Sequence, residues 1–406
     1  MRLAYFVWEY PPRLIGGLGT YAAEMTAQLA AKGHDVTVFT MNDGAKLPTF
    51  EEIGERIEVH RPLVADATAV LPVFVDEELR RWGEGLRFFG DVLTYNFLSA
   101  NLFANKIAKK EGFDLVVCHD WLSAIAGVVA QKNTGRPMVF HVHSTEHGRS
   151  GGRGSSTIRN LEYTTAQNAD MIITVSYSMR EELHVLNFPG ARIRVMWNGV
   201  DEKKYNIANF PAEERAACRK RLGFAEDDKV VLFTGRLTFV KGVDSLVRAL
   251  PLVLAKVPKA RLVILGRGEM ADEIRALIAR HGLKDKVVLI DKWVEERERL
   301  LLYACCDAVC APSRYEPFGI VPLEGMAMGK PVVVGLGGLR ETVLDGKNGF
   351  WCEPDKPESI AAGLIRLLGD DALAKAMGEA GRKRVEKLYT WEKIAHETIE
   401  LYESVI

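Results

Sequence analysis

The chain has 406 residues, of which 48% are hydrophobic and 26% are charged, and its formal net charge is −1. This length allows two domains with separate cores, and the composition is typical of a soluble globular protein. A net charge near zero gives no general attraction to nucleic acid or to an anionic membrane, so neither is expected as a partner.

The cysteines and the apolar runs indicate a reducing compartment. The six cysteines include no Cys-x-x-Cys pair and no paired spacing with histidine, so we expect neither a structural zinc nor a disulfide framework. The sequence passes from Met1 directly into LAYFVW, without a stretch typical of a signal peptide. No apolar run reaches the roughly 18 residues of a membrane span. These features predict a cytoplasmic protein without a transmembrane segment.

The first half alternates apolar runs, typical of buried strands, with stretches of helical periodicity. Strands are predicted over residues 3–8, 36–40, 57–60, 114–118, 137–142, 170–175 and 193–196. Helices are predicted over residues 20–32, 80–89, 95–108, 121–129 and 177–186, the last with Ser176 as its cap.

A glycine-rich loop joins the first strand to the first helix and contains Gly16 and Gly17. Glycine allows a ligand to approach the backbone closely, and a helix N-terminus favours phosphate or sugar oxygens. A tight strand-to-helix loop often contains glycine for purely structural reasons as well. The spacing is not Gly-x-Gly-x-x-Gly, so the fingerprint of a dehydrogenase is absent.

Two histidine-containing segments follow strands of the first half. Asp120 and Trp121 come after the strand at 114–118, at the sheet edge where ligands of open α/β sheets bind. Asp120 is also a good helix cap, and Trp121 equally suits the core. Farther on, His141 and His143 point the same way from a strand, but no fourth ligand is offered. We therefore do not expect a metal site there.

The second half repeats strands and helices every 25 to 30 residues, which indicates a parallel sheet of βαβ units. Strands are predicted over residues 230–234, 261–265, 287–290, 308–311 and 332–334. Arg236 and Lys241 lie on the loop after the first of them, where two cations suit a diphosphate. The alternative is a pair of solvated surface cations. Gly266 follows the second strand and precedes a helix.

The most informative stretch runs from Ala311 to Val334 and contains Glu-Pro-Phe-Gly-Ile-Val-Pro-Leu-Glu, from Glu316 to Glu324. It predicts a strand, a loop and a helix over residues 320–328, ended by Gly329. Such a loop and helix N-terminus attract an anion. The plainer interpretation of the two carboxylates is one capping residue and one surface residue.

This nine-residue pattern resembles the signature of retaining glycosyltransferases that use nucleotide sugars, of the glycogen synthase and sucrose synthase type, called family 4. The stretch Arg236–Gly242 also matches the family's Arg-Leu-x-x-x-Lys-Gly motif. The resemblance implies the GT-B fold, with two doubly wound, Rossmann-like α/β domains of parallel sheets facing each other across a deep interdomain cleft. The expected domains are an acceptor-side domain (1–200), a donor-binding domain (201–390), and a C-terminal helix (391–406) that crosses back.

The resemblance also implies roles for individual residues. Glu324 would bind the donor ribose, and Arg236 and Lys241 the departing diphosphate. The remaining assignments are Glu316, Phe318, Gly319 and Ile320 beside the sugar and phosphates, Gly16, Gly17 and Gly266 as donor-binding glycines, His143 near the sugar 6-hydroxyl, and Asp120 and Trp121 at the acceptor. In the family a lysine usually stands where this chain has Leu14, and the adjacent Arg13 is the candidate substitute.

The expected activity is retaining transfer of glucose from ADP- or UDP-glucose to the non-reducing end of an α-1,4-glucan. The segments around His119-Asp120-Trp121 and His143 resemble those of microbial and archaeal α-glucan synthases. The alternatives are synthesis of a small glucoside (sucrose, sucrose phosphate or trehalose), transfer to a lipid or surface glycan, and a non-catalytic nucleotide-sugar sensor. No Asp-x-Asp motif occurs, so neither a metal nor a cofactor is expected.

Overall fold

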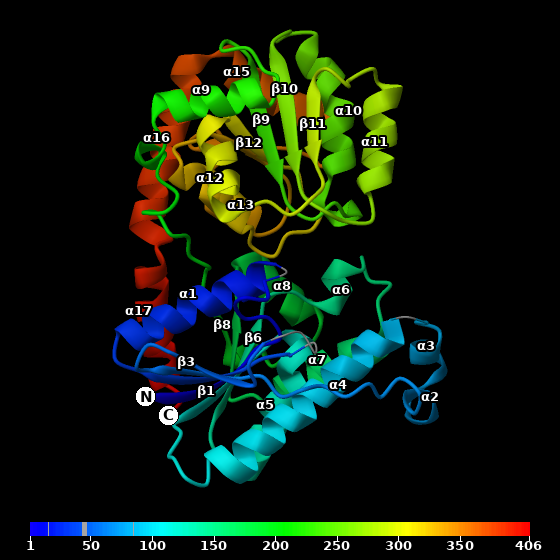
Figure 1. Cartoon of the computed structure of the whole chain (residues 1–406), viewed down its shortest axis with the longest axis vertical. Helices are drawn as coiled ribbons and strands as arrows, with labels where there is room; N and C mark the ends of the chain where they lie inside the picture. Colours follow the sequence, from blue (N-terminus) through cyan, green and yellow to red (C-terminus); the bar gives the residue numbers. More distant parts are fainter. Residues whose placement is uncertain (15, 43–46, 84) are drawn as a thin grey trace. The chain divides into compact units, whose positions relative to one another are not determined.

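The computed structural model describes residues 1–14, 16–42, 47–83 and 85–406, which form two compact units (Figure 1). The first unit comprises Met1–Trp197 together with Trp391–Ile406, and the second comprises Asn198–Thr390. The sequence analysis placed the first boundary at residue 200. The predicted cleft between the domains stays a prediction.

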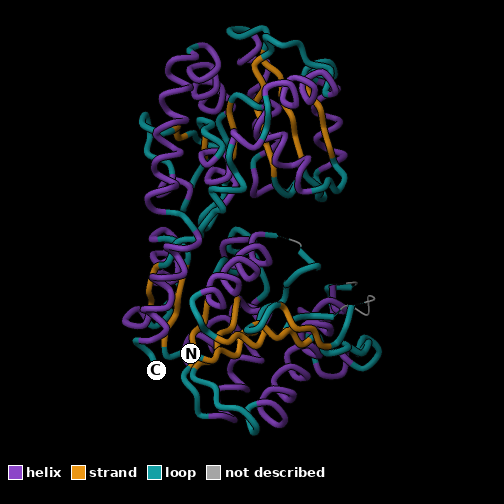
Figure 2. The backbone as a smooth tube through the Cα atoms, turned by 60° about the vertical axis from the view of Figure 1, so that its left-hand side comes forward, coloured by secondary structure: helices purple, strands orange, loops and turns teal. Residues whose placement is uncertain are grey.

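The first unit is built on an eight-stranded sheet in the order β3-β4-β2-β1-β5-β6-β7-β8 (Figure 2). All neighbours pair in parallel except β3 and β4, which are antiparallel. The strands are β1 (Arg2–Phe6), β2 (Asp35–Phe39), β3 (Phe50–Ile53), β4 (Ile57–His60), β5 (Leu115–His119), β6 (Met138–Val142), β7 (Met171–Thr174) and β8 (Ile193–Val195).

Helices cover both faces of this sheet, which explains why its central strands are apolar runs rather than alternating patterns. The α-helices are α1 (Gly17–Ala31), α2 (Leu71–Phe74), α3 (Glu77–Arg80), α4 (Gly85–Leu102), α5 (Asp120–Thr134), α6 (Glu146–Arg149), α7 (Ser156–Asn168), α8 (Tyr177–Val185) and α17 (Trp391–Glu403). A π-helical turn, Phe103–Ile107, follows α4.

The face covered by α1 and α17 carries the core that matters for function. Alternate residues of the strands, such as Leu3, Tyr5 and Val117, are fully buried there against both helices. Ile394 and Tyr402 of α17 belong to the same core. The C-terminal helix is therefore part of the first unit, although it follows the second unit in sequence.

The second unit contains a six-stranded parallel sheet in the order β11-β10-β9-β12-β13-β14. The strands are β9 (Lys229–Thr234), β10 (Ala260–Leu265), β11 (Val287–Ile290), β12 (Ala308–Ala311), β13 (Val332–Val334) and β14 (Gly349–Trp351). The α-helices are α9 (Ala212–Arg221), α10 (Val243–Leu254), α11 (Ala271–Arg280), α12 (Glu296–Cys305), α13 (Ile320–Ala327), α14 (Leu339–Thr342), α15 (Pro357–Gly369) and α16 (Asp371–Leu388).

Residue parity divides the second core into two layers. Val231, Ile264 and Cys310 point to the face covered by α10, α11 and α15. Their neighbours in sequence face the other way, and a side chain at Gly325 of α13 would meet Val309 and Val332 there. This arrangement holds the loops at the carboxyl ends of the strands on a rigid base.

Several predictions are confirmed and others are wrong. The strands at 57–60, 287–290, 308–311 and 332–334 have the predicted bounds, and the Ser176 hydroxyl accepts a hydrogen bond from the Met179 N–H as a helix cap does. The two helices expected within 80–108 are wrong, because α4 runs without a break from Gly85 to Leu102. Gly90, which suggested an interruption, packs against Leu71, where a side chain would collide.

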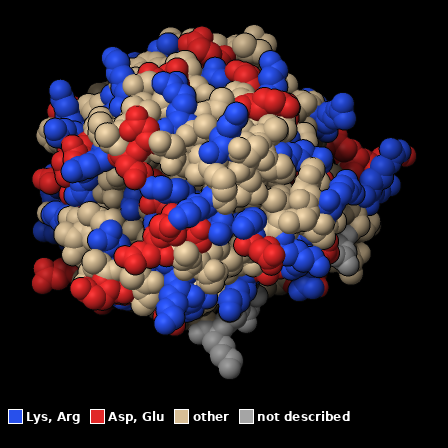
Figure 3. Space-filling model, turned by 90° about the horizontal axis from the view of Figure 1, so that it is seen from above, with Lys and Arg blue, Asp and Glu red and all other residues tan. Residues whose placement is uncertain are grey.

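The sequence analysis also missed the outer strands β3 and β14. Strand β3 lies at the sheet edge, and most of its residues are exposed, so it lacks an apolar pattern. On the face shown in Figure 3, Lys and Arg side chains are interspersed with Asp and Glu rather than gathered by sign. This distribution agrees with the net charge of −1.

Candidate functional site

The second unit brings Glu316 and Lys241 into direct contact. Glu316 lies on the loop between β12 and α13, and Lys241 ends the 3₁₀ turn Phe239–Lys241 after β9. The Lys241 Nζ is 2.5 Å from Glu316 Oε2, and their side chains are only 22% and 17% exposed. Partial burial strengthens the attraction between such charges.

Close packing between the two loops fixes this ion pair. Gly242 has a φ of +68°, and a Cβ there would collide with the carbonyl oxygen of Pro312. Arg314 adds a second link, because its NH1 and NH2 groups donate to the two carboxylate oxygens of Asp244 at 2.8 and 3.0 Å. The β12 loop is thus held against the start of α10.

The other predicted diphosphate ligand, Arg236, lies on the same loop as Lys241. Its side chain is exposed and forms no ion pair with any residue that the structure describes. A side chain at Gly266 would collide with the carbonyl oxygen of Gly235, so the loops after β9 and β10 touch. The structure therefore groups Arg236, Lys241, Gly266 and Glu316 at the carboxyl edge of one sheet.

Glu324 is buried in α13 and has three side-chain donors. Its Oε1 accepts hydrogen bonds from the Tyr205 hydroxyl and, at 2.8 Å, from Arg299, and its Oε2 accepts from the Tyr303 hydroxyl at 2.5 Å. Glu324 is also the main reason that the pKa of Arg299 rises above its ordinary value. Neither the capping nor the surface interpretation of Glu324 is correct, because it is buried and fully engaged.

Sequence reasoning missed Tyr205, Arg299 and Tyr303 as partners of Glu324. One signal was available, because Arg299 and Tyr303 are four residues apart on α12, a spacing that places both on one face. Tyr205 lies 119 residues before Glu324 and carries no local pattern that indicates the contact.

Phe318, Gly319 and Ile320 form the start of α13. Phe318 is buried, and its ring meets that of Tyr389 edge-on with centroids 6.1 Å apart. Gly319 precedes the first helical residue, Ile320. The first N–H groups of a helix have no partner within it, so this backbone is able to receive an anion.

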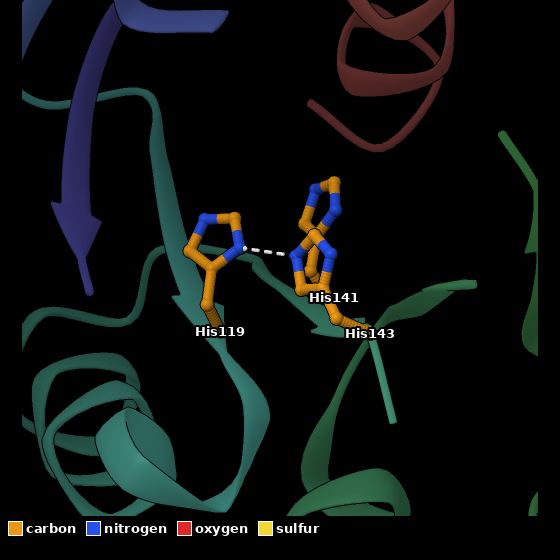
Figure 4. Close-up of side chains that lie close together, drawn as sticks. All are labelled: His119, His141 and His143. Carbon is orange, nitrogen blue, oxygen red and sulfur yellow. Dashed lines mark hydrogen bonds between the residues drawn. The ribbon is translucent and has the colours of Figure 1, made fainter. Parts of the chain in front are cut away.

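In the first unit, three histidines form a cluster beneath α1 and α17, which we call the histidine cluster: His119, His141 and His143 (Figure 4). The parallel register of β5 and β6 pairs His119 with His141, and His143 follows two residues later on the same face. His119 Nδ1 lies 3.1 Å from His143 Nε2, a hydrogen-bond distance.

Two tyrosines from the covering helices complete this network. The Tyr402 hydroxyl of α17 is 2.8 Å from His141 Nε2, and the Tyr21 hydroxyl of α1 is 3.5 Å from His141 Nδ1. Burial lowers the pKa of His119, His141 and His143, so the three imidazoles are neutral at pH 7. For His143, the carboxylate of Asp120 opposes this effect.

Geometry favours a hydrogen-bonded network over a metal site. The three candidate ligand nitrogens lie within 4.8 Å of one another, but the rings stack with interplanar angles of 16° to 28°. Lone pairs lie in the ring planes, so stacked rings do not direct them at one ion in the tetrahedral manner of zinc. That no metal is required stays a prediction.

Asp120 corrects a detail of the sequence analysis. It does not cap α5, because His119 is the residue before the helix and Asp120 is its first member, with a φ of +51°. Its Oδ1 instead accepts hydrogen bonds from the backbone N–H groups of His143 at 2.7 Å and Ser144 at 3.4 Å. Asp120 thus fixes the backbone of a predicted site residue. Trp121 is buried in an aromatic cluster.

The glycine loop lies at the start of α1, although Ile15 within it falls outside the described residues. Gly16 and Gly17 are exposed, and the Gly16 N–H donates to Glu9 Oε2 at 2.9 Å. Gly16 has an extended backbone, and a Cβ there would meet nothing within 4 Å, so the fold does not require glycine. Arg13 lies over the Trp8 ring, 5.2 Å from its centroid.

The buried histidines predict a loss of stability in acid. In the unfolded chain they titrate near 6.5, and in the fold at lower pH, so the unfolded state binds more protons in between. The free energy of unfolding should therefore fall as the pH drops below 6.5, by up to about 1.4 kcal/mol per pH unit for each histidine. Urea unfolding across this range should show a smaller fall for His141→Asn than for the exposed control His396→Asn. Equal falls would contradict the prediction.

Comparison with known proteins agrees with this arrangement. Residues 214–384 match the family described as Glycosyl transferases group 1, and residues 15–204 match Glycosyltransferase Family 4. An uncharacterised glycosyltransferase of Methanocaldococcus jannaschii is 35% identical, covering 99% of this chain and 98% of the relative. A glycogen synthase of Mycobacterium tuberculosis is 32% identical over 99% and 94%. An α-maltose-1-phosphate synthase of Mycolicibacterium smegmatis is 30% identical over 100% of both.

Solved structures show the same fold. The sucrose-phosphate synthase of Thermosynechococcus elongatus superposes with a TM-score of 0.82 and 24% identity, covering 100% of this chain and 98% of that one. The catalytic domain of starch synthase IV from Arabidopsis thaliana has a TM-score of 0.77 and 18% identity, covering 99% of both chains.

These findings define an enzyme with the GT-B fold that transfers a sugar from a nucleotide-sugar donor. The chain belongs to glycosyltransferase family 4. Among the helices that the structure describes, none combines the length and apolar character needed to cross a membrane.

Proposed function

We propose that this enzyme elongates an α-1,4-glucan by moving glucose from ADP- or UDP-glucose to the non-reducing end, with retention of anomeric configuration. The observation that carries the proposal is the similarity to the M. tuberculosis glycogen synthase, at 32% identity over 99% of this chain. The grouping of the signature residues at one sheet edge supports it.

In this proposal, Arg236 and Lys241 stabilise the charge that develops on the departing diphosphate. Breaking the bond between the anomeric carbon and the diphosphate leaves negative charge on the phosphate oxygens, and preorganised cations are the most effective response. Two cations fulfil this need without a metal or a cofactor. Glu316 holds the Lys241 ammonium at 2.5 Å and positions the donor sugar, rather than acting as a covalent nucleophile.

Glu324 is the proposed ligand of the donor ribose. Its oxygens already accept from Tyr205, Arg299 and Tyr303, so a ribose hydroxyl either shares an oxygen with these groups or replaces one of them. A carboxylate offers about four lone-pair sites, so at least one further hydrogen bond fits. The backbone at the start of α13 would receive the phosphates.

The first unit supplies the remaining proposed contacts. His143 meets the sugar near its 6-hydroxyl, with its backbone held by Asp120 and its imidazole neutral. A neutral imidazole both donates and accepts a hydrogen bond, as a hydroxyl partner requires. Gly16 and Gly17 approach the donor, and Asp120 and Trp121 lie at the acceptor.

A small acceptor is the second candidate. The M. smegmatis relative, which is named for the synthesis of α-maltose 1-phosphate, matches the chain end to end at 30% identity. Such an enzyme uses the same donor chemistry with a phosphorylated sugar as acceptor. Sucrose, sucrose phosphate or trehalose formation, and transfer to a lipid or surface glycan, remain in the same class.

Product analysis separates these activities. The purified chain is incubated with ADP- or UDP-glucose and, in turn, oligomaltose, glucose, glucose 1-phosphate, fructose or fructose 6-phosphate, and the products are resolved by chromatography. We expect oligomaltose to lengthen by single α-linked glucose units, with the α-configuration seen by proton NMR. A product formed only from a small acceptor, or a β-linked product, would overturn the proposal.

A further inference from the structure

A cavity in the second unit has no role in the proposed reaction. Its volume is about 560 Å³, and it lies between α9 and the end of α12 (Figure 1). Asp307 and Lys330 in its wall precede β12 and β13, whereas Glu316 and Lys241 follow the opposite, carboxyl ends of β12 and β9. The strands are parallel, so the cavity and the signature residues lie at opposite edges of the sheet.

One arginine forms a fixed wall of this cavity. Arg219 NH2 donates to both carboxylate oxygens of Asp307 at 2.9 Å, and its Nε donates to the Cys305 carbonyl at 2.9 Å. Its NH1 donates to the carbonyl of Asp228, also at 2.9 Å. Arg219 and Asp307 therefore neutralise each other, and neither offers a net charge to a ligand.

Two further cations lack such compensation. The Lys330 Nζ donates to the carbonyls of Ala304 and Cys306 at 2.9 and 2.7 Å, which engages two of its three N–H groups. Arg215 forms no ion pair within the described ranges, and its Nε is buried without a hydrogen-bond acceptor. Burial lowers the pKa of Lys330, and the like charge of Arg215 lowers it further.

The cavity wall thus has an excess of positive charge. Lys220 adds a third cation, and the exposed Glu226 is the carboxylate that remains once Asp307 is paired. Unsatisfied buried donors are costly unless a ligand or water accepts from them. Arginine and lysine together are the usual ligands of phosphate, arginine through its planar fork and lysine as a point charge.

We propose that this cavity binds a small phosphorylated molecule, with the phosphate against Arg215 and Lys330. Its volume falls in the range of small-molecule sites, roughly 300–1,000 Å³, and exceeds what inorganic phosphate alone fills. The class of ligand is a phosphate monoester with a polar body about the size of a sugar.

Both helices that border the cavity also reach Glu324. Residues 304–306 in the wall directly follow Tyr303, which donates to Glu324, and Lys330 follows α13, which carries Glu324. A phosphate that draws the Lys330 ammonium from its two carbonyls alters the end of α12. If Glu324 binds the ribose, as proposed above, the ligand changes the KM for the donor more than kcat.

Calorimetric binding by the full chain tests the site without requiring turnover. The probes are glucose 6-phosphate, inorganic phosphate and uncharged glucose. We expect saturable binding of glucose 6-phosphate, weaker binding of phosphate and none of glucose. Arg215→Ala should weaken glucose 6-phosphate binding about 10–100-fold, because it removes charge-assisted hydrogen bonds.

Two matched variants locate the binding. Arg280→Ala removes an exposed arginine elsewhere in the second unit, and Arg236→Ala removes a cation at the proposed donor site; neither should affect glucose 6-phosphate binding. Unchanged nucleoside diphosphate binding by Arg215→Ala would show that the fold persists. Loss of sugar phosphate binding in Arg236→Ala with retention in Arg215→Ala, or no saturable binding to the wild-type chain, would overturn the proposal.

Discussion

Replacing Lys241 by alanine is expected to lower kcat by about 10²–10³-fold, the typical effect of losing one preorganised donor to transition-state charge. The ammonium has no substitute at its position, because Arg236 lies on the exposed part of the same loop and does not contact Glu316. The loss should appear in kcat rather than only in KM, because the charge develops as the bond breaks. Steady-state measurement of diphosphate release gives both constants.

The double variant with Glu316→Gln distinguishes a pair from two independent groups. Because Lys241 Nζ and Glu316 Oε2 are 2.5 Å apart, the effects of the two single substitutions should not add in the double variant. Lys256→Ala, which removes an exposed lysine from the end of α10, is the matched control and should leave kcat unchanged. A Lys241→Ala enzyme with the kcat of the control would contradict the role of Lys241.

Replacing Glu324 by alanine should destabilise the second unit by about 3–5 kcal/mol, the usual cost of removing one partner of a buried ion pair. The substitution leaves Arg299 without its main counter-charge, and the hydroxyls of Tyr205 and Tyr303 without their acceptor. Urea unfolding measures this loss. Glu316→Ala is the comparison, because Glu316 is more exposed and should cost less stability.

The more conservative Glu324→Gln separates stability from donor binding. Glutamine keeps the shape and one carbonyl oxygen, so the chain should fold while the KM for the donor rises about 10–100-fold through the loss of charge-assisted hydrogen bonds to ribose. The KM for the acceptor should stay unchanged. A folded Glu324→Gln enzyme with wild-type donor KM would show that Glu324 has only a structural role.

The parts of the fold that sequence predicted best are those in which burial imposes a pattern. Strands β11, β12 and β13 are short apolar runs bounded by glycine, proline or charge, and their bounds agree with the prediction. The same reasoning failed for β3, whose edge position leaves its side chains in water, and for α4, where close packing on Leu71 requires Gly90.

The candidate site was only partly accessible to sequence reasoning for a related reason. Strand alternation correctly predicted that His141 and His143 share a face, but the pairing with His119 depends on the register between two strands. The contact of His141 with Tyr402 joins residues 261 positions apart. Such long-range contacts are set by tertiary packing, and the local pattern around either residue does not indicate them.

The measurement that tests the central claim most directly is diphosphate release, with ADP-, UDP- and GDP-glucose each combined with glycogen, maltose, fructose 6-phosphate or no acceptor. We predict release that depends on glycogen or maltose, with ADP- or UDP-glucose as donor, and that is strongly reduced in Lys241→Ala. Release that occurs only with fructose 6-phosphate would replace the glucan synthase by an enzyme that makes a small glucoside. Release that ignores every acceptor, or that survives the loss of Lys241, would contradict the account.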